Sequence, residues 1–162
     1  MQDTILQSIG WTPLVRLRRM TEGVSATVAV KVESGNPGGS VKDRVGLAMI
    51  QEAEQRGWLR PGGTVIEATA GNTGVGLAMV AAVKGYRCIF VLPDKMSNEK
   101  IALLKAYGAE VVITATNVPP DSPESYNGVA DRLAPRTRKG WPPCTKRFCN
   151  PLAIRRWSAF AG

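Results

Sequence analysis

Short apolar segments alternate with longer amphipathic ones along most of the chain. Short runs with alternating or continuous apolar character are typical of strands, and apolar residues spaced three and four apart are typical of helices. The expected strands are residues 26–32, 64–68, 88–93 and 110–114, and the expected helices are residues 41–56, 72–84, about 98–107 and about 125–134. This alternation predicts βαβ units, and therefore an α/β fold with an open, mostly parallel sheet flanked by helices.

Three of these helices carry further local signals. The apolar residues of the first helix share one face, namely Val45, Ala48, Met49 and Ala53. Residues 72–84 are apolar almost all round, which is typical of a buried helix, and Gly85 supplies its end. We expect Ser97 to cap the third helix and Gly108 to end it.

The pattern changes abruptly at Pro135. Residues 135–162 contain seven lysines and arginines, no carboxylate, and no helix or strand period. We therefore expect two parts, with residues 1–134 as the N-terminal portion of an α/β domain and residues 135–162 as a basic irregular tail. The break falls inside a helical pattern, which motivates the hypothesis that the tail is read out of frame; resequencing the gene around this codon tests it.

The net charge of +8 at pH 7 is concentrated in this tail. Four aromatic residues of the tail interleave with the basic ones, namely Trp141, Phe148, Trp157 and Phe160. Such an arrangement can bind RNA or an anionic surface. An unselected basic tail explains the same composition and is the favoured interpretation. We therefore do not expect a nucleic-acid partner.

The cysteine and histidine content limits which metal sites, disulfides and catalytic groups this chain can have. Cys144 and Cys149 supply at most half of a metal site, so we interpret them as unpaired thiols, and we interpret Cys88 as a core residue. Three cysteines do not make a secreted disulfide framework, and we find neither a signal pattern nor an apolar run that could cross a bilayer. We expect a cytoplasmic protein. Because the sequence has no histidine, His-based metal sites and Ser-His or Cys-His catalysis are excluded.

A glycine-rich turn, SGNPGGSVKDR at 34–44, comes directly before the first predicted helix. Ser40 and Asp43 have the spacing of a capping box, which places Lys42 in the first turn. The positive end of the helix dipole disfavours an ammonium there, so a partly buried Lys42 should lose its proton more readily than a surface lysine. Schiff-base chemistry requires such a neutral amine. The alternative is a solvated lysine on an ordinary capped helix.

A second glycine-rich segment, EATAGNTGVGLA at 67–78, also follows a strand and opens a helix. Its backbone N–H groups, the hydroxyls of Thr69 and Thr73 and the amide of Asn72 can surround a carboxylate or phosphate. The alternative is a tight turn whose glycines serve only close packing. Because ligands gather beyond the carboxyl ends of parallel strands, both segments point to one site for a carbonyl cofactor and an amino-acid carboxylate.

Five segments together form a specific pattern, namely IGWTPLVRL at 9–17, KVESGNPGGSVKDR at 31–44, EATAGNTGVGLAMVAAVKGYR at 67–87, PDKMSNEK at 93–100 and AYGAEVV at 106–112. Over about residues 5–134, this pattern resembles the cysteine synthase (O-acetylserine sulfhydrylase) and cystathionine β-synthase family. The resemblance implies the tryptophan synthase β-like fold, fold type II of the pyridoxal phosphate enzymes, with only its N-terminal half present.

The resemblance also implies roles for individual residues. Lys42 is expected to form the Schiff base with pyridoxal 5′-phosphate and to move protons, and Asn72 to hydrogen-bond the ring oxygen of the cofactor. The residues expected to bind the carboxylate of the amino-acid substrate are Thr69, Ala70, Gly71, Asn72 and Thr73. Ala70 replaces a serine frequently found in the family, which removes one hydroxyl and leaves the backbone donors.

The implied reaction is β-replacement on O-acetylserine or serine by a thiol or sulfide. Cysteine synthase is favoured over cystathionine β-synthase, but the residues of these five segments do not distinguish sulfide from homocysteine as the nucleophile. Family members are commonly homodimers and continue for about as many residues again, supplying a phosphate-binding loop that has no counterpart after residue 134. A non-catalytic remnant that keeps the Lys42 side of the site is therefore the alternative to an active enzyme.

Overall fold

The computed structural model describes residues 1–69, 71–119, 121–136 and 152–153. Its helices are α1 (Lys42–Gln55), α2 (Asn72–Lys84), α3 (Asn98–Ala106) and α4 (Tyr126–Arg136), with short 3-10 helices η1 (Ile5–Ser8), η2 (Arg19–Thr21) and η3 (Glu33–Gly35). Its strands are β1 (Leu14–Arg16), β2 (Ala29–Lys31), β3 (Thr64–Glu67), β4 (Arg87–Pro93), β5 (Glu110–Thr114) and β6 (Leu152–Ala153).

The main sheet has the strand order β5-β4-β3-β6, and each neighbouring pair is parallel. In this register Val65 of β3 lies beside Cys88 of β4, and Phe90 of β4 lies beside Val111 of β5. Neighbouring parallel strands need a crossover connection, which α2 supplies between β3 and β4 and α3 supplies between β4 and β5. The α/β fold with an open parallel sheet flanked by helices is thereby confirmed.

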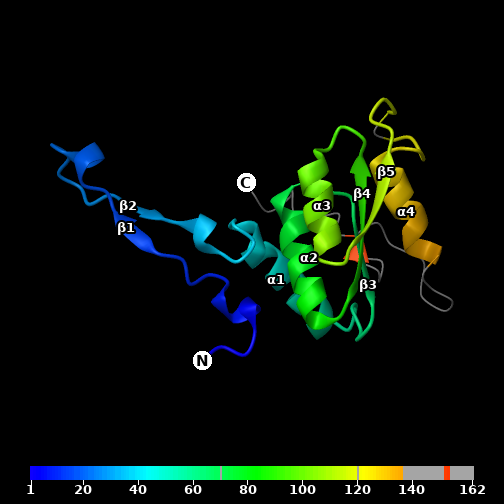
Figure 1. The fold of residues 1–162 in the computed structure, drawn as a ribbon, viewed down its shortest axis with the longest axis horizontal. Helices are drawn as coiled ribbons and strands as arrows, with labels where there is room; N and C mark the ends of the chain where they lie inside the picture. The colour runs from blue at the N-terminus through cyan, green and yellow to red at the C-terminus, as the bar shows by residue number, and fades with distance from the viewer. Residues whose placement is uncertain (70, 120, 137–151, 154–162) are drawn as a thin grey trace.

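Helices cover both faces of this sheet (Figure 1). Alternate residues of a strand point to opposite faces, so Cys88 and Phe90 pack with α1, α2 and α3, whereas Ile89 and Val91 pack with α4. Burial raises the pKa of the Cys88 thiol to about 12, because a thiolate would be poorly solvated there. Cys88 is therefore a core residue, as the sequence predicts.

Helices α1 and α2 run side by side in the same direction. Near their C-terminal ends, the Glu54 carboxylate accepts hydrogen bonds from the Lys84 ammonium and from the Tyr86 hydroxyl, both at 2.6 Å. Near their N-terminal ends, the two backbones meet at Gly46 and Gly76. Both helices therefore begin at the same edge of the sheet, where β3 ends.

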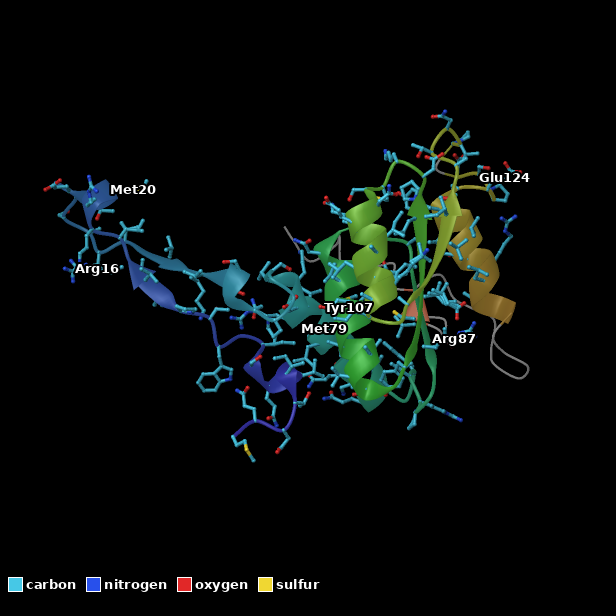
Figure 2. All side chains as sticks on the ribbon, viewed as in Figure 1. Arg16, Met20, Met79, Arg87, Tyr107 and Glu124 are labelled. Atoms are coloured by element: carbon cyan, nitrogen blue, oxygen red, sulfur yellow. The ribbon has the colours of Figure 1, made fainter. Side chains whose placement is uncertain are left out.

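The expectation that residues 26–32 form a strand is only partly met, since β2 covers Ala29–Lys31. β2 does not join the main sheet, because it pairs antiparallel with β1 in a separate two-stranded sheet. This sheet belongs to an arm that extends away from the helices, and Figure 2 shows Arg16 and Met20 near its far end. Apolar alternation indicates a strand but does not specify its partner.

The buried face of α1 differs from the predicted one at several positions. Val45, Met49 and Ala53 contact the core as predicted, but Ala48 is exposed, and Gly46 and Ile50 are buried. At position 46 the close approach of α2 leaves room only for a glycine.

The boundaries of α2 and α3 follow the predicted signals, except for the side-chain cap at Ser97. Gly85 ends α2 with a φ of 74°, and Gly108, with a φ of 82°, follows α3. Ser97 precedes α3 as predicted, but its side chain forms no capping hydrogen bond. Within the described part of the chain, no helix combines the length and apolar character needed to cross a membrane.

The tail contributes two features to the described structure. α4 continues to Arg136, and Leu152–Ala153 forms β6, which pairs with β3 where no strand was predicted. Cys144 and Cys149 lie outside the described residues, as do the four tail aromatic residues. The division into residues 1–134 and a basic irregular tail stays a prediction.

Candidate functional site

Lys42 is the first residue of α1, and its side chain is exposed. The predicted capping box is wrong, because Val41 is the N-cap and the Ser40 hydroxyl accepts from the backbone N–H of Lys42 at 3.1 Å. The Asp43 carboxylate accepts instead from the backbone N–H of Gly38 at 2.5 Å. Lys42 is exposed, so its amine is accessible from solvent and the condition of partial burial is not met.

Asp43 lies under the glycine-rich turn and is fully buried. Its Oδ1 atom has no hydrogen-bond partner among the described residues, and burial raises the pKa of this carboxyl because a charge is poorly solvated there. A Cβ on Gly38 would lie 2.5 Å from that oxygen, so a side chain does not fit at this position. The turn before Lys42 thus needs a glycine at position 38, because the Asp43 carboxylate occupies the space of a side chain there.

Arg44 connects α1 to the N-terminal segment. Its guanidinium pairs with Glu33 through Nε–Oε2 and Nη2–Oε1 hydrogen bonds of 2.9 Å each, and Nη2 also donates to the carbonyl oxygen of Gly10 at 2.9 Å. Hydrogen bonding to Arg44 lowers the pKa of Glu33 from 4.5 to about 2. Because a pair with two parallel bonds fixes orientation as well as distance, Arg44 orients the first turn of α1.

Asn36 completes this network. Its Oδ1 accepts from the backbone N–H of Gly10 at 2.8 Å, and its Nδ2 donates to Glu33 Oε2 at 2.8 Å. Asn36 is buried, which makes both bonds important because an unpaired amide would be costly there. The segments around Gly10 and Asn36 therefore form one unit that supports the start of α1.

The contact between α1 and α2 brings the two glycine-rich segments together. A Cβ on Gly46 would lie 2.6 Å from the carbonyl carbon of Gly76, and a Cβ on Gly76 would lie 2.7 Å from the carbonyl oxygen of Lys42. Only glycine allows backbones to approach so closely. Lys42 consequently lies beside the second turn of α2, one turn after Asn72.

Thr69 and Gly71 lie between β3 and α2, and Asn72 and Thr73 are the first two residues of α2. Thr69 is half-buried and its hydroxyl accepts from the backbone N–H of Gly71 at 3.4 Å, whereas Ala70 lies outside the described residues. Asn72 is exposed at the first position of α2, and Thr73 is half-buried. Gly71 is the N-cap, so no side chain caps the start of α2; the Gly74 N–H donates to the Gly71 carbonyl oxygen at 3.0 Å, and the end of the helix carries the partial positive charge that suits an anion.

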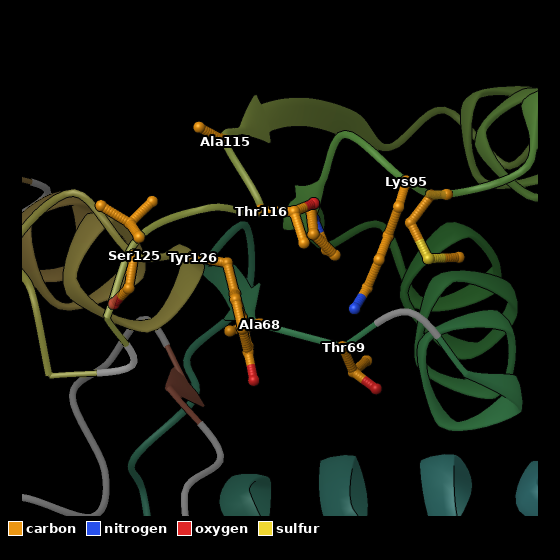
Figure 3. A pocket seen from close by; sticks show the side chains of 10 residues that line it. Ala68, Thr69, Lys95, Ala115, Thr116, Ser125 and Tyr126 are labelled. Carbon is orange, nitrogen blue, oxygen red and sulfur yellow. The ribbon is translucent and has the colours of Figure 1, made fainter.

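A cavity of about 500 Å³ opens where β3, β4 and β5 end (Figure 3). Its polar lining consists of one ammonium and four hydroxyls, from Lys95, Thr69, Thr116, Ser125 and Tyr126. Thr69 also begins the 69–73 segment, so the cavity adjoins the predicted carboxylate-binding residues.

The chain matches the family model described as "Pyridoxal-phosphate dependent enzyme" over residues 5–159. The chain belongs to this family. It is 58% identical to cystathionine beta-synthase of Oryctolagus cuniculus over 131 residues, which are 80% of this chain and 24% of that protein. It is 56% identical to cysteine synthase of Staphylococcus aureus (strain Mu50 / ATCC 700699) over 112 residues, which are 69% of this chain and 36% of that protein.

Solved structures agree with the family assignment. O-ureido-L-serine synthase superposes with a TM-score of 0.76 at 46% identity, over 87% of this chain and 43% of that one. The predicted family, its fold type II architecture and its pyridoxal phosphate cofactor are confirmed. The chain spans only about a quarter of the length of the rabbit relative.

The residues around Lys42 fit the aldehyde and ring side of this cofactor. An accessible primary amine lies at the start of α1, and the amide of Asn72 lies at the start of the adjacent α2. The N-terminal end of α2 adds partial positive charge at the same edge of the sheet. An amine, an amide and free backbone N–H groups are the donors that a carbonyl cofactor and a carboxylate need.

Sequence reasoning assigned no role to several residues that shape this site. Asn36, Glu33 and Arg44 position the start of α1, and Lys95 and Tyr126 line the adjoining cavity. The sequence motifs partly indicated these residues, because the first three lie within the segment at 31–44 and Lys95 lies within PDKMSNEK. The segments do not reveal these contacts, which join residues far apart in the chain.

Proposed function

We propose that this chain carries the lysine side of a site for pyridoxal phosphate-dependent β-replacement. In this reaction sulfide or a thiol displaces the β-substituent of O-acetylserine or serine; sulfide gives L-cysteine, as in a cysteine synthase. The Gly46–Gly76 contact carries the proposal, because it sets Lys42 beside the second turn of α2, one turn after Asn72. Lys42 attaches the cofactor, Asn72 bonds its ring oxygen, and residues 69–73 bind the substrate carboxylate.

The bound cofactor supplies an electron sink for negative charge on the substrate α-carbon. The residues of this chain bind, orient and move protons around it. The N–H groups at the start of α2 hold the substrate carboxylate, and the Lys42 amine takes the proton from the α-carbon and returns it. The Glu33–Arg44 pair keeps the first turn of α1 oriented, so that Lys42 stays within reach.

Two alternatives stand beside this proposal. Cystathionine β-synthase is the second candidate, because the match to the rabbit protein of that name extends over 131 residues. A non-catalytic remnant is the third, and cofactor binding without turnover identifies it. A homodimer and a cytoplasmic location remain predictions from the resemblance and the cysteine usage.

Trapping the cofactor on the chain tests the role of Lys42. We expect the purified full chain to develop visible absorbance with pyridoxal phosphate, and borohydride reduction followed by peptide mapping to label Lys42 alone. Lys42→Ala should abolish the label, because the attacking amine is gone. Lys100→Ala, which removes an exposed lysine of α3, is the matched control and should keep it.

Labelling scattered over surface lysines, or none at all, contradicts the proposal. If Lys42 is labelled, turnover assays distinguish the three candidates. O-acetylserine with sulfide tests cysteine synthase, serine with homocysteine tests cystathionine β-synthase, and binding without turnover identifies a remnant.

A further inference from the structure

The start of α1 contains a buried acid that the proposed reaction does not use. Asp43 directly follows Lys42, and its side chain is fully buried. Among the described residues, no ion pair includes it, and the neighbouring Arg44 pairs with Glu33 instead. A buried carboxyl without a cation is unfavourable, so packing alone does not explain an acid at this position.

The Asp43 carboxyl holds the middle of the glycine-rich turn. Its Oδ2 atom accepts from the backbone N–H of Gly38 at 2.5 Å. The three atoms nearest to a Cβ on Gly38 would all belong to this carboxyl, at distances of 2.5 Å to 2.9 Å. Gly38 therefore lies directly against Asp43, and a methyl group at position 38 would displace one of the two.

The Gly38–Asp43 hydrogen bond closes a short loop that contains Lys42. Within this loop the Ser40 hydroxyl accepts from the backbone N–H of Lys42 at 3.1 Å. The Gly39 N–H donates to the carbonyl oxygen of Asn36 at 2.8 Å, which ties the loop to the buried Asn36. Since a closed loop has fewer backbone arrangements than an open one, the bond restricts the direction in which the Lys42 side chain leaves α1.

Helix α2 fixes Asp43 from the other side. A Cβ on Gly76 would lie 3.2 Å from the Cα of Asp43 and 2.7 Å from the carbonyl oxygen of Lys42. Asp43 therefore cannot shift toward α2. Its place is set by the contact between the two helices, and its hydrogen bond extends that placement to the turn at Gly38.

We propose that Asp43 is a positioning residue for Lys42: its carboxyl locks the turn at Gly38 and thereby holds the Lys42 amine where pyridoxal phosphate binds. The inference rests on the proposed function, which gives Lys42 its role. The Oδ1 atom has no partner among the described residues, which makes the acid unfavourable for folding. An apolar side chain would fill the same space without that penalty but would not hold Gly38.

A double-mutant cycle between positions 38 and 43 tests this assignment. Asp43→Ala removes the acceptor, and Gly38→Ala places a methyl group against the carboxyl. We expect each change to slow the borohydride-trapped labelling of Lys42 by pyridoxal phosphate about ten-fold relative to Lys100. The double variant should be slowed by much less than the product of the two effects, because Ala at position 38 no longer meets a carboxyl. Asp43→Asn keeps an acceptor oxygen and should label at nearly the rate of the wild type.

A second readout measures the order of the turn without the cofactor. Nitrogen-15 relaxation of the full chain reports the order of the Gly38 and Lys42 backbone amides. We expect both amides to become less ordered in Asp43→Ala and to keep their order in Asp43→Asn. The amides of β4 should be unchanged in both variants, which distinguishes a local effect on the turn from a general loss of stability.

Asp131→Ala changes an exposed acid of α4 and is the matched control, which should follow the wild type in both measurements. Wild-type labelling and order in Asp43→Ala overturn the inference, as do independent effects at positions 38 and 43. If Asp43→Ala does not fold, equal labelling of Gly38→Ala and Asp43→Asn overturns it. Order at Lys42 that depends on Asp43, without labelling of Lys42 in the wild type, contradicts the proposed function alone.

Discussion

Glu33 has an unusual environment for a half-buried carboxylate. Two nitrogen atoms of Arg44 and the amide of Asn36 donate to its oxygens, and the Thr12 hydroxyl donates to Oε1 at 2.9 Å. These donors stabilise the charged form, which is why the pKa falls to about 2. A carboxylate bound in this way links the stability of the fold to pH.

Because the pKa of Glu33 is lower in the folded protein than its ordinary value, its charge stabilises the fold at neutral pH. The Glu33 contribution should be fully present above pH 4.5 and should be lost as the pH falls toward 2, because the unfolded chain takes up the proton first. Glu33→Gln should therefore destabilise the protein near neutral pH, and the difference from wild type should shrink on acidification. Urea unfolding followed by circular dichroism at pH 7 and pH 3 measures it.

The control for this experiment is Glu22→Gln, which changes an exposed carboxylate outside the α-helices. We expect this variant to follow the wild type at both pH values. A Glu33→Gln difference that is constant with pH would show that the carboxylate acts by packing and not by charge.

Gly46 and Gly76 set the close packing of α1 against α2, although glycine has a low helix propensity. Glycine within a helix costs about 1 kcal/mol relative to alanine, so an ordinary Gly→Ala change stabilises. At Gly46 the added methyl group would meet the backbone of Gly76 at 2.6 Å, and backbone does not yield as a flexible side chain does. We expect Gly46→Ala to destabilise the fold by about 1–3 kcal/mol, measured by urea unfolding at equilibrium.

Ala48→Gly calibrates this result, because Ala48 is exposed on the same helix and reports propensity alone. It should cost about 1 kcal/mol. We also expect Gly46→Ala to reduce labelling of Lys42 by pyridoxal phosphate, since the helix that carries Lys42 must move away from α2. A stabilised Gly46→Ala variant would refute the close contact.

The elements that could be predicted from sequence are those whose signals are local. α2 begins and ends at the predicted residues, because a continuous apolar run and the left-handed Gly85 both act within the helix itself. The strand at 26–32 was placed in the wrong sheet, because its partner β1 is chosen by a long-range antiparallel contact. The capping box at Ser40 failed for a local reason, because the Asp43 carboxylate accepts from the backbone N–H of Gly38, five residues earlier.

On the scale of the whole molecule, a packed body contrasts with an open arm. The β4 strand is buried on both faces and paired on both edges, whereas β1 and β2 are exposed along their length. A two-stranded sheet of this kind is marginally stable in water unless something covers it. Large apolar side chains on the arm are exposed as well, among them Leu14 and Met20.

Hydrogen exchange should reveal this contrast directly. Amides of β4 should exchange only through opening of the whole body, and amides of β1 and β2 should exchange close to the rate of an unstructured chain. Mass spectrometry of peptic fragments after timed exchange measures both regions in one sample. Equal protection of the arm and β4 would mean that the arm is covered in solution.

The sequence by itself determined the fold class, the family and the position of Lys42 at the start of a helix. These properties depend on periodicity and on short motifs, which are read from neighbouring residues. Only the tertiary structure decided which glycines meet, that Arg44 binds Glu33 across the start of α1, and that Lys95 faces a cavity beside Thr69. Those features arise from contacts between residues distant in the chain, where packing space and charge, and not local propensity, select the arrangement.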